Sequence, residues 1–170
     1  MVATNEARRP RGTPPVRILA GQAGSDEAAR TMRAYLNELA ERLDTSVDPM
    51  LAERVDPAEV TPPRGDFMLV REIATAETVG FGAVRVLRPG TAEITRMWLK
   101  PDVRGRGLGR FLLRELENRA RALGANDVLL AVNDQLAEAC GLYRASGYRT
   151  VERFVDTPYA THFFGKSLHE

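Results

Sequence analysis

The chain has 170 residues, 44% of them hydrophobic and 28% charged, which is the composition of one globular domain. Its 24 basic and 23 acidic residues leave a formal charge of +1, so no basic excess argues for a nucleic-acid partner, and no apolar run reaches the roughly 18 residues of a membrane span. The one cysteine, Cys140, excludes an internal disulfide, and because the start of the chain lacks the apolar core of a secretory signal we expect a cytoplasmic protein.

The first quarter of the chain predicts a tail, a short strand and a helix. Residues 1–15 are polar and rich in proline and arginine, so we expect a disordered tail ahead of a single domain at 16–170. The segment 16–20 predicts a strand. A helix is predicted over 25–43, because Ser25 is a suitable N-cap and four apolar side chains follow at helical spacing. These side chains are Met32, Leu36, Leu39 and Leu43.

The middle of the chain predicts a loop and then three consecutive strands. Segment 44–65 contains four prolines, so we expect a loop with at most a short helix near 57–60. Strands are predicted at 66–73, 78–87 and 92–99. The short turns between these strands are typical of an antiparallel meander.

The last part of the chain alternates helices and strands. Apolar residues at helical spacing predict a helix over 108–123, which Gly124 ends. The almost wholly apolar run 127–132 predicts a strand covered on both faces, and a further helix is predicted over 134–147. Two more strands are predicted, at 148–155 and 161–168. This order indicates a mixed α/β fold in which helices cover a central sheet.

The stretch VRGRGLGR at 103–110 lies between a predicted strand and a predicted helix, and it combines three glycines with three arginines. Its spacing is neither that of a Walker loop nor that of a Rossmann fingerprint. The first N–H groups of a helix lack internal partners, and glycines let a ligand approach them closely. The stretch therefore predicts a phosphate or pyrophosphate site, with a solvated turn as the alternative.

Three parts of the chain together resemble the GNAT acetyltransferase superfamily. Arg104-x-x-Gly107-x-Gly109 is similar to the R/Q-x-x-G-x-G/A pyrophosphate loop of that family, AEITRMWLKP resembles the strand before the loop, and NDQLAEACGLYRASGY resembles the later segment with Leu-Tyr before Gly-Tyr. NELAERL and PYATHFFGKSL also look like a bacterial subgroup, so the resemblance spans 16–170. It implies the GNAT fold: a mixed, mostly antiparallel sheet of about seven strands, flanked by helices and splayed between the fourth and fifth strands.

The resemblance implies a donor site for acetyl-CoA in the gap between the strands at 92–99 and 127–132. The pyrophosphate would lie on the N–H groups of the loop. The pantetheine arm would run along the strand at 92–99, where a backbone N–H could hold the oxyanion. Asn133 would contact the cofactor, although it could equally be a helix cap. The residues implied to bind acetyl-CoA are Met97, Trp98, Leu99, Arg104, Gly105, Arg106, Gly107, Leu108, Gly109, Arg110 and Asn133.

Two residues are implied to act in catalysis. Tyr143 matches the tyrosine that protonates the leaving thiolate in similar proteins, and a phenol with a pKa of about 10 carries its proton at neutral pH. The alternative is a packed helix residue. Glu93 could take a proton from the amine, directly or through a water, or it could be a surface carboxylate or one that binds a cationic substrate. Glu93, Thr95 and Met97 share one strand face unless a bulge intervenes.

The acceptor side is less well defined by the sequence. Arg96 is expected to point to the face opposite Met97, where its role could be substrate binding or structural. Tyr35, Tyr159 and His162 fall in segments that could border the acceptor pocket. With two histidines and one cysteine, the chain has too few ligands to predict a metal site. Thr157, Phe163 and Gly165 depart from the residues of similar sequences, so no relative's acceptor is transferred to this chain.

The function that these observations predict is acyl transfer. We expect an N-acetyltransferase that moves the acetyl group of acetyl-CoA to a primary amine of a small molecule or peptide, by direct attack in a ternary complex. The alternative is a non-catalytic module that binds or senses acyl-CoA. We expect no nucleic-acid partner, because the loop arginines are local and the aromatic content is 6%. Dimers are common among similar proteins.

Overall fold

The computed structural model describes residues 15–43 and 56–169. The tail predicted at 1–15, apart from its last residue, and most of the loop predicted at 44–65 therefore lie outside the described residues. The described residues form a seven-stranded mixed sheet in the order β1-β2-β3-β4-β5-β7-β6. The strands are β1 (Val16–Leu19), β2 (Gly65–Glu72), β3 (Thr78–Arg88), β4 (Thr91–Leu99), β5 (Asp127–Val132), β6 (Arg149–Thr150) and β7 (His162–Ser167).

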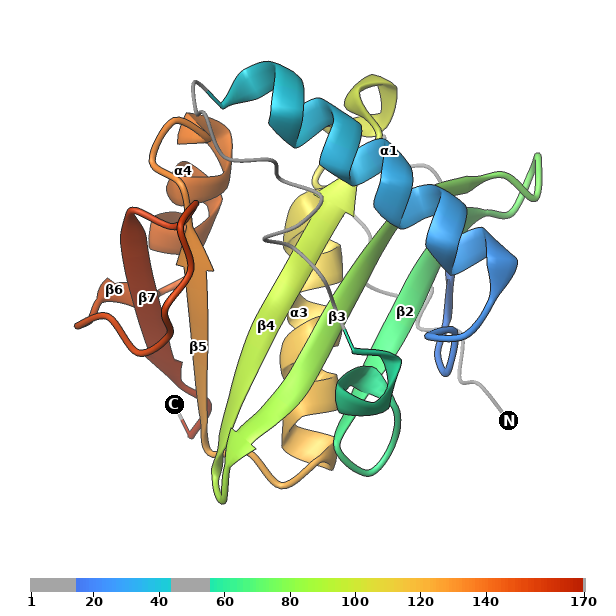
Figure 1. Ribbon diagram of the computed structural model, residues 1–170. Helices are drawn as coiled ribbons and strands as arrows, with labels where there is room; N and C mark the ends of the chain where they lie inside the picture. The colour runs from blue at the N-terminus through green and yellow to red at the C-terminus, as the bar shows by residue number, and fades with distance from the viewer. Residues whose placement is uncertain (1–14, 44–55, 170) are drawn as a thin grey trace.

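Helices cover both faces of this sheet (Figure 1). α1 (Asp26–Arg42) crosses one face, and α3 (Leu108–Ala122) packs on the other. α4 (Ala137–Ala145) lies beside the end of β5. Two short 3-10 helices, η2 (Pro57–Val60) and η3 (Pro101–Val103), precede β2 and follow β4. None of the described helices combines the length and the apolar character needed to cross a membrane.

The start of α1 follows the sequence prediction. Ser25 is the N-cap, and its hydroxyl accepts a hydrogen bond from the N–H of Ala28 at 3.0 Å. Asp26 and Glu27 occupy the first turn, where the helix dipole favours negative charge. The apolar face of the helix is buried, and Leu39 is among its most deeply buried side chains. The helix predicted over 25–43 is therefore confirmed.

The core forms a layer on each face of the sheet. Under α3 the layer is aliphatic, and Leu116 lies so close to β3 that a Cβ on Gly82 would stand 2.7 Å from its side chain. Under α1 the layer is aromatic, with the rings of Phe67 and Phe81 stacked at 5.1 Å. Each large apolar side chain buried in these layers stabilises the fold by about 1.5–3 kcal/mol. The two layers hold the sheet rigidly beneath the site described below.

β4 and β5 separate along their length, and this separation is the feature that positions the site. Neighbouring strands of the described sheet pair antiparallel except β4 and β5, which pair in parallel. Their pairing runs from Thr91 opposite Asp127 to Glu93 opposite Leu129. Beyond these residues the two strands diverge (Figure 1). The predicted mixed sheet, splayed between its fourth and fifth strands, is therefore confirmed.

The strand predicted at 148–155 is much shorter in the structure, so the predicted length is wrong. β6 contains only Arg149 and Thr150, and one further backbone bond joins Val151 N to Phe163 O at 2.9 Å. Beyond Val151, side-chain contacts replace the backbone pairing of the strands. The ring of Phe154 packs edge-on against that of Phe163, with the ring centroids 5.6 Å apart. The chain leaves the sheet here, and Val155 already lines a cavity rather than a strand edge.

The helix predicted over 134–147 is shorter at both ends. A turn precedes it, in which Asn133 Oδ1 accepts a hydrogen bond from Gln135 N at 2.9 Å and Asn133 O accepts one from Leu136 N at 3.0 Å. This turn delays the first helical residue to Ala137. Gly147 takes a φ of +91° and closes the other end.

Candidate active site

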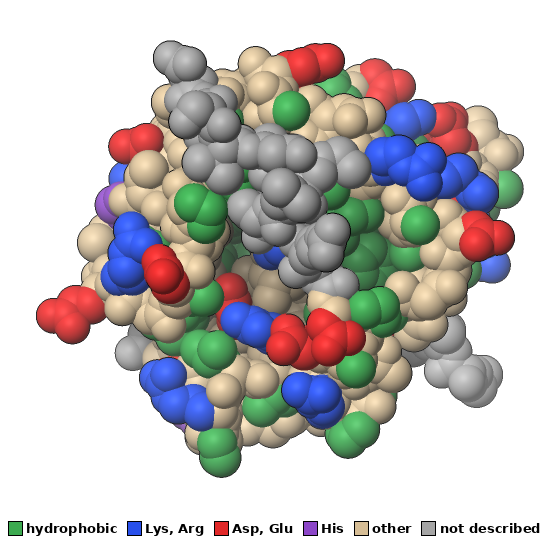
Figure 2. Space-filling model, in the orientation of Figure 1, with side chains coloured by type: hydrophobic (Ala, Val, Ile, Leu, Met, Phe, Trp, Pro, Cys, Tyr) green, Lys and Arg blue, Asp and Glu red, His purple; other side chains and the backbone are tan. Residues whose placement is uncertain are grey.

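The separation of β4 and β5 opens two adjoining cavities. The larger, of about 740 Å³, lies among α1, the end of β4, the start of α3 and α4. The smaller, of about 260 Å³, lies between β4 and β5. Figure 2 shows a hollow on this face with acidic and basic side chains beside it. The two cavities meet at residues that line both, which are Tyr35, Leu39, Met97, Leu136 and Ala139.

The loop between β4 and α3 presents backbone donors at the larger cavity. Gly105 and Gly107 take left-handed φ angles of +79° and +77°, a conformation that costs other residues about 1–2 kcal/mol. The first hydrogen bond of α3 runs from Phe111 N to Gly107 O at 3.1 Å. The N–H groups of residues 108–110 consequently donate to no described residue. Successive free donors at a helix N-terminus form a concave site for an anion.

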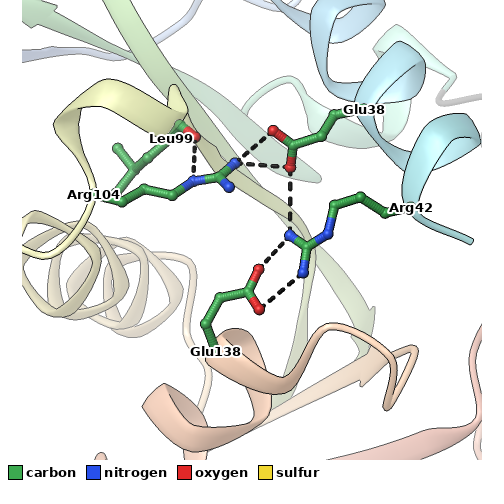
Figure 3. Close-up of polar contacts among 5 residues, drawn as sticks. All are labelled: Glu38, Arg42, Leu99, Arg104 and Glu138. Atoms are coloured by element: carbon green, nitrogen blue, oxygen red, sulfur yellow. Dashed lines mark hydrogen bonds and ion pairs between the residues drawn. The ribbon is translucent and has the colours of Figure 1, made fainter.

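The arginines of the loop play different parts in the structure. Arg104 donates from Nε to the carbonyl of Leu99 at 2.9 Å and from Nη2 to both carboxylate oxygens of Glu38 at 2.8 Å (Figure 3). Arg110 is exposed and lines the larger cavity. Arg106 is exposed and lines neither cavity. Arg110 therefore adds positive charge at the larger cavity, whereas Arg106 does not line it.

The free edge of β4 forms one wall of both cavities. β3 pairs with one edge of β4, while the other edge has no described strand partner beyond Glu93. Met97, Trp98 and Leu99 line the larger cavity along this edge. Alternate backbone N–H and C=O groups of an unpaired strand edge are available to hydrogen-bond an extended ligand.

A bulge in β4 changes which side chains share a face. Arg96 pairs with Ala83 and Ile94 pairs with Val84, so Thr95 is an extra residue in β4. Because Glu93 pairs with Arg85, two residues from Ala83 on β3, Glu93 and Arg96 lie on the same face. The bulge therefore prevents Glu93, Thr95 and Met97 from sharing one face of the strand. Arg96 and Met97 point to opposite faces, as the sequence predicts.

Glu93 is a buried carboxylate held by an arginine. Its side chain is 7% exposed, and its Oε2 lies 2.8 Å from Arg85 Nε and 2.7 Å from Arg85 Nη2. Arg85 also donates to Glu59 of η2 at 2.9 Å. All three side chains line the smaller cavity, where one guanidinium holds two carboxylates. No described residue hydrogen-bonds Glu93 Oε1.

Tyr143 projects from α4 into the smaller cavity. The rings of Tyr148 and Phe164 lie with their centroids 5.9 Å from its own, so the phenol is packed on its sides. No described residue hydrogen-bonds its hydroxyl. Burial raises the pKa of Tyr143 well above its ordinary value, and Cys140 adds to this effect. The hydroxyl is therefore neutral and keeps its proton throughout the neutral pH range.

Some of the other predicted residues line a cavity, and others make contacts away from the cavities. Tyr35, Tyr159 and Asn133 line the smaller cavity, and Asn133 Nδ2 donates to the carbonyl of Tyr159 at 2.7 Å. Asn133 thus fastens the segment after β6 to the end of β5. His162 lines neither cavity, and its ring nitrogen shares a 2.9 Å hydrogen bond with Thr150. Among residues 15–43 and 56–169, no group of three or more acidic, histidine or cysteine side chains could hold a metal ion.

Besides Arg114 and Asp156, sequence reasoning missed five charged residues that line the cavities. Each of the five contacts a residue that is distant in the sequence. Glu38 lies 66 residues from Arg104, and Glu138 lies 96 residues from Arg42. The only local signal is a helical stripe on α1, where charged residues flank Leu39. These five residues are Glu38, Arg42, Glu59, Arg85 and Glu138.

Cys140 is expected to resist thiol reagents in the native protein. Its side chain is buried in α4, and burial raises the pKa of the thiol above its ordinary value, so the reactive thiolate is scarce at pH 8. Titration with a chromogenic disulfide should show almost no release from the native protein and one equivalent after unfolding in guanidinium. Rapid release of one equivalent from the native protein would contradict this placement.

Comparison with known proteins identifies the family. The model of the Acetyltransferase (GNAT) family matches residues 31–148. An uncharacterized N-acetyltransferase of Schizosaccharomyces pombe is 30% identical over 135 residues, which are 78% of this chain and 81% of the relative. An L-methionine sulfoximine/L-methionine sulfone acetyltransferase of Pseudomonas aeruginosa is 34% identical over 110 residues, and the match covers 62% of each chain.

Solved structures show the same fold. A GNAT-family acetyltransferase of Staphylococcus aureus superposes with a TM-score of 0.76 at 15% identity, over 91% of this chain and 99% of the other. A phosphinothricin acetyltransferase of Sinorhizobium meliloti, in complex with acetyl-CoA, gives a TM-score of 0.64 at 18% identity, over 92% and 89% of the two chains. The chain belongs to the GNAT acetyltransferase family, and it is an acyltransferase that uses acetyl-CoA as its acetyl donor.

Proposed function

We propose that this enzyme transfers the acetyl group of acetyl-CoA to a primary amine of a small molecule or peptide, by direct attack in a ternary complex. The observation that carries the proposal is that two cavities meet at the free edge of β4. One has backbone donors suited to an anion, and the other holds a neutral phenol and a buried carboxylate. Donor and acceptor can therefore bind side by side, and proximity alone lowers the barrier to transfer.

The larger cavity is the proposed donor site. The N–H groups of residues 108–110 bind the pyrophosphate, and the exposed side chain of Arg110 adds positive charge. The pantetheine arm lies along residues 97–99, whose strand edge has no described partner. A backbone N–H on that edge polarises the thioester carbonyl and stabilises the negative charge that develops on its oxygen.

Tyr143 is the proposed general acid. Its hydroxyl has no described hydrogen-bond partner, its side chain lines the smaller cavity, and its raised pKa means that it carries its proton at neutral pH. A thiolate that departs into a site without water is itself poorly solvated, which raises the pKa of the thiol and lets it take the proton of the phenol. These three observations favour catalysis over the alternative of a module that only binds acyl-CoA.

The smaller cavity is the proposed acceptor site. Its volume of about 260 Å³ is below the roughly 300–1,000 Å³ that is usual for drug-sized ligands. This size supports a small amine, or the terminal amine of a longer chain. The Pseudomonas aeruginosa relative is named for L-methionine sulfoximine and L-methionine sulfone, which also supports a small acceptor.

A panel of amines provides the test of this function. The enzyme is incubated with acetyl-CoA and, in turn, amino acids, aromatic amines, polyamines and peptides with free N-termini. We expect amine-dependent release of CoA, with the acetylated amine identified by mass spectrometry. Binding of acetyl-CoA without transfer to any class of amine would contradict the proposed amine acceptor.

Glu93 is the proposed general base, and its replacement tests that role. Oε1 is the oxygen free to accept a proton from the amine or from a bridging water, because Arg85 holds Oε2. We expect Glu93→Gln to lower kcat/KM about tenfold at neutral pH, and the two rates to converge at high pH, where the amine loses its proton unaided.

Glu59→Gln is the matched control for this prediction. It removes the other carboxylate from Arg85, yet it is expected to keep the shape of the wild-type pH–rate profile. A Glu93→Gln enzyme with the wild-type profile would limit Glu93 to binding or structure.

A further inference from the structure

Four charged side chains form a continuous chain of ion pairs along the larger cavity (Figure 3). Arg104 in the loop lies 2.8 Å from Glu38 of α1, Glu38 lies 3.6 Å from Arg42 on the next turn, and Arg42 Nη2 lies 2.9 Å from Glu138 of α4. All four line the cavity. Arg42 lowers the pKa of Glu138 below its ordinary value, so this carboxylate is ionised at neutral pH.

The guanidinium of Arg104 is held by contacts with two other parts of the fold. Nε bonds the carbonyl of Leu99 at the end of β4, and Nη2 bonds both oxygens of Glu38. The side chain therefore ties the loop to the sheet on one side and to α1 on the other (Figure 3). A carboxylate with an arginine on either side is well satisfied, and moving Arg104 to another anion would leave Glu38 with a single weaker partner at 3.6 Å.

The other cations of the cavity are differently placed. Arg110 and Arg114 line the cavity and are exposed, and no described residue forms an ion pair with either. These two side chains can turn toward a bound phosphate without breaking an ion pair to a described residue. The structure thus separates one arginine that fixes the loop from two that remain available.

We propose that Glu38 is a positioning residue: through Arg104 it holds the β4–α3 loop in the shape that binds the pyrophosphate. The proposal rests on the donor site assigned above. Glu38 lies outside the loop motif, on a helix that also borders the acceptor cavity through Tyr35 and Leu39. Through Arg42 and Glu138 the same chain of charges reaches α4, the helix that carries Tyr143.

Two accounts of Glu38 predict effects of opposite sign. If Glu38 positions the loop, its loss weakens binding of any ligand that carries the pyrophosphate. If instead Arg104 binds the pyrophosphate directly and Glu38 merely competes for it, the loss of Glu38 frees Arg104 and strengthens binding. Titration calorimetry with acetyl-CoA and with ADP, which carries a pyrophosphate without the pantetheine arm, distinguishes the two accounts.

The test compares Glu38→Gln with Glu41→Gln, the same change on an exposed position of the same helix. We expect Glu38→Gln to raise the Kd of both ligands by the same factor, about tenfold, and Glu41→Gln to leave both unchanged. Thermal midpoints of the two unliganded variants should agree. Arg104→Gln should raise Kd as Glu38→Gln does, and the double variant should lose no more than either single one, because both remove the same contact.

Unchanged or tighter binding by Glu38→Gln would overturn the proposal, and so would additive losses in the double variant. A wild-type enzyme that binds acetyl-CoA but not ADP would overturn the donor site on which it rests. Failure of the proposed function has a different signature, because an enzyme that acetylates no amine would still give these titrations.

Discussion

Replacing Gly107 with valine should weaken acetyl-CoA binding at least about a hundredfold, the loss expected when two or more hydrogen bonds to a charged group are broken. Gly107 is the N-cap of α3 at a φ of +77°, which a β-branched residue adopts only with strain. The backbone would shift, and the N–H groups of residues 108–110 would turn from their common direction. Titration calorimetry with acetyl-CoA measures the change in Kd.

Gly124→Val is the matched control for that experiment. Gly124 follows the opposite end of α3 at a φ of +93°, and a Cβ there would meet no atom within 4 Å. The control carries a comparable backbone strain far from the cavities, so it should lower the thermal midpoint without changing Kd. A Gly107→Val protein that binds like the wild type, or a Gly124→Val protein that loses binding equally, would contradict the loop's assigned role.

The second large effect is expected from Tyr143→Phe, which should lower kcat about a hundredfold while leaving the Kd of acetyl-CoA nearly unchanged. The substitution removes one oxygen from a ring that Tyr148 and Phe164 keep packed, and no described residue loses a hydrogen bond. The cost therefore falls on proton transfer to the leaving thiolate rather than on binding. Steady-state rates of CoA release and calorimetry together separate the two quantities.

Tyr148→Phe is the control for the phenol. Tyr148 is also buried in contact with Tyr143, but its hydroxyl lies 3.4 Å from Glu117 of α3 and the residue lines neither cavity. Its replacement should leave kcat unchanged. Wild-type turnover by Tyr143→Phe would remove that residue from the mechanism.

Much of the fold follows from local patterns in the sequence. Helical spacing of apolar residues, the Ser25 cap and the glycine at 124 place α1 and α3 within a residue or two of their observed ends. The sequence predicts a strand over 148–155, yet the length of that strand depends on where Phe154 and Phe163 meet in space. The short β6 therefore could not be derived from the segment alone.

The site was predictable only where a motif marks it. The glycine spacing of 103–110 indicates an anion-binding helix N-terminus, because the backbone conformation itself requires those glycines. By contrast, the pairing of Arg85 with Glu93 depends on the register of the β3–β4 hairpin, which shifts between Val86 and Arg88, and that of Arg104 with Glu38 depends on how α1 crosses the sheet. Neither depends on a pattern within one segment, so neither could be found before the chain was folded.

The thermal midpoint of the wild-type protein with acetyl-CoA tests the central claim, that the cavity beside residues 104–110 is the donor site. At a hundredfold excess over Kd, binding adds about 2.7 kcal/mol of stability. For a domain of this size we expect a rise of roughly 5–10 °C, with a smaller rise for ADP at the same concentration. No rise with acetyl-CoA at millimolar concentration would contradict the account, because the pyrophosphate loop and the edge of β4 would then hold no donor.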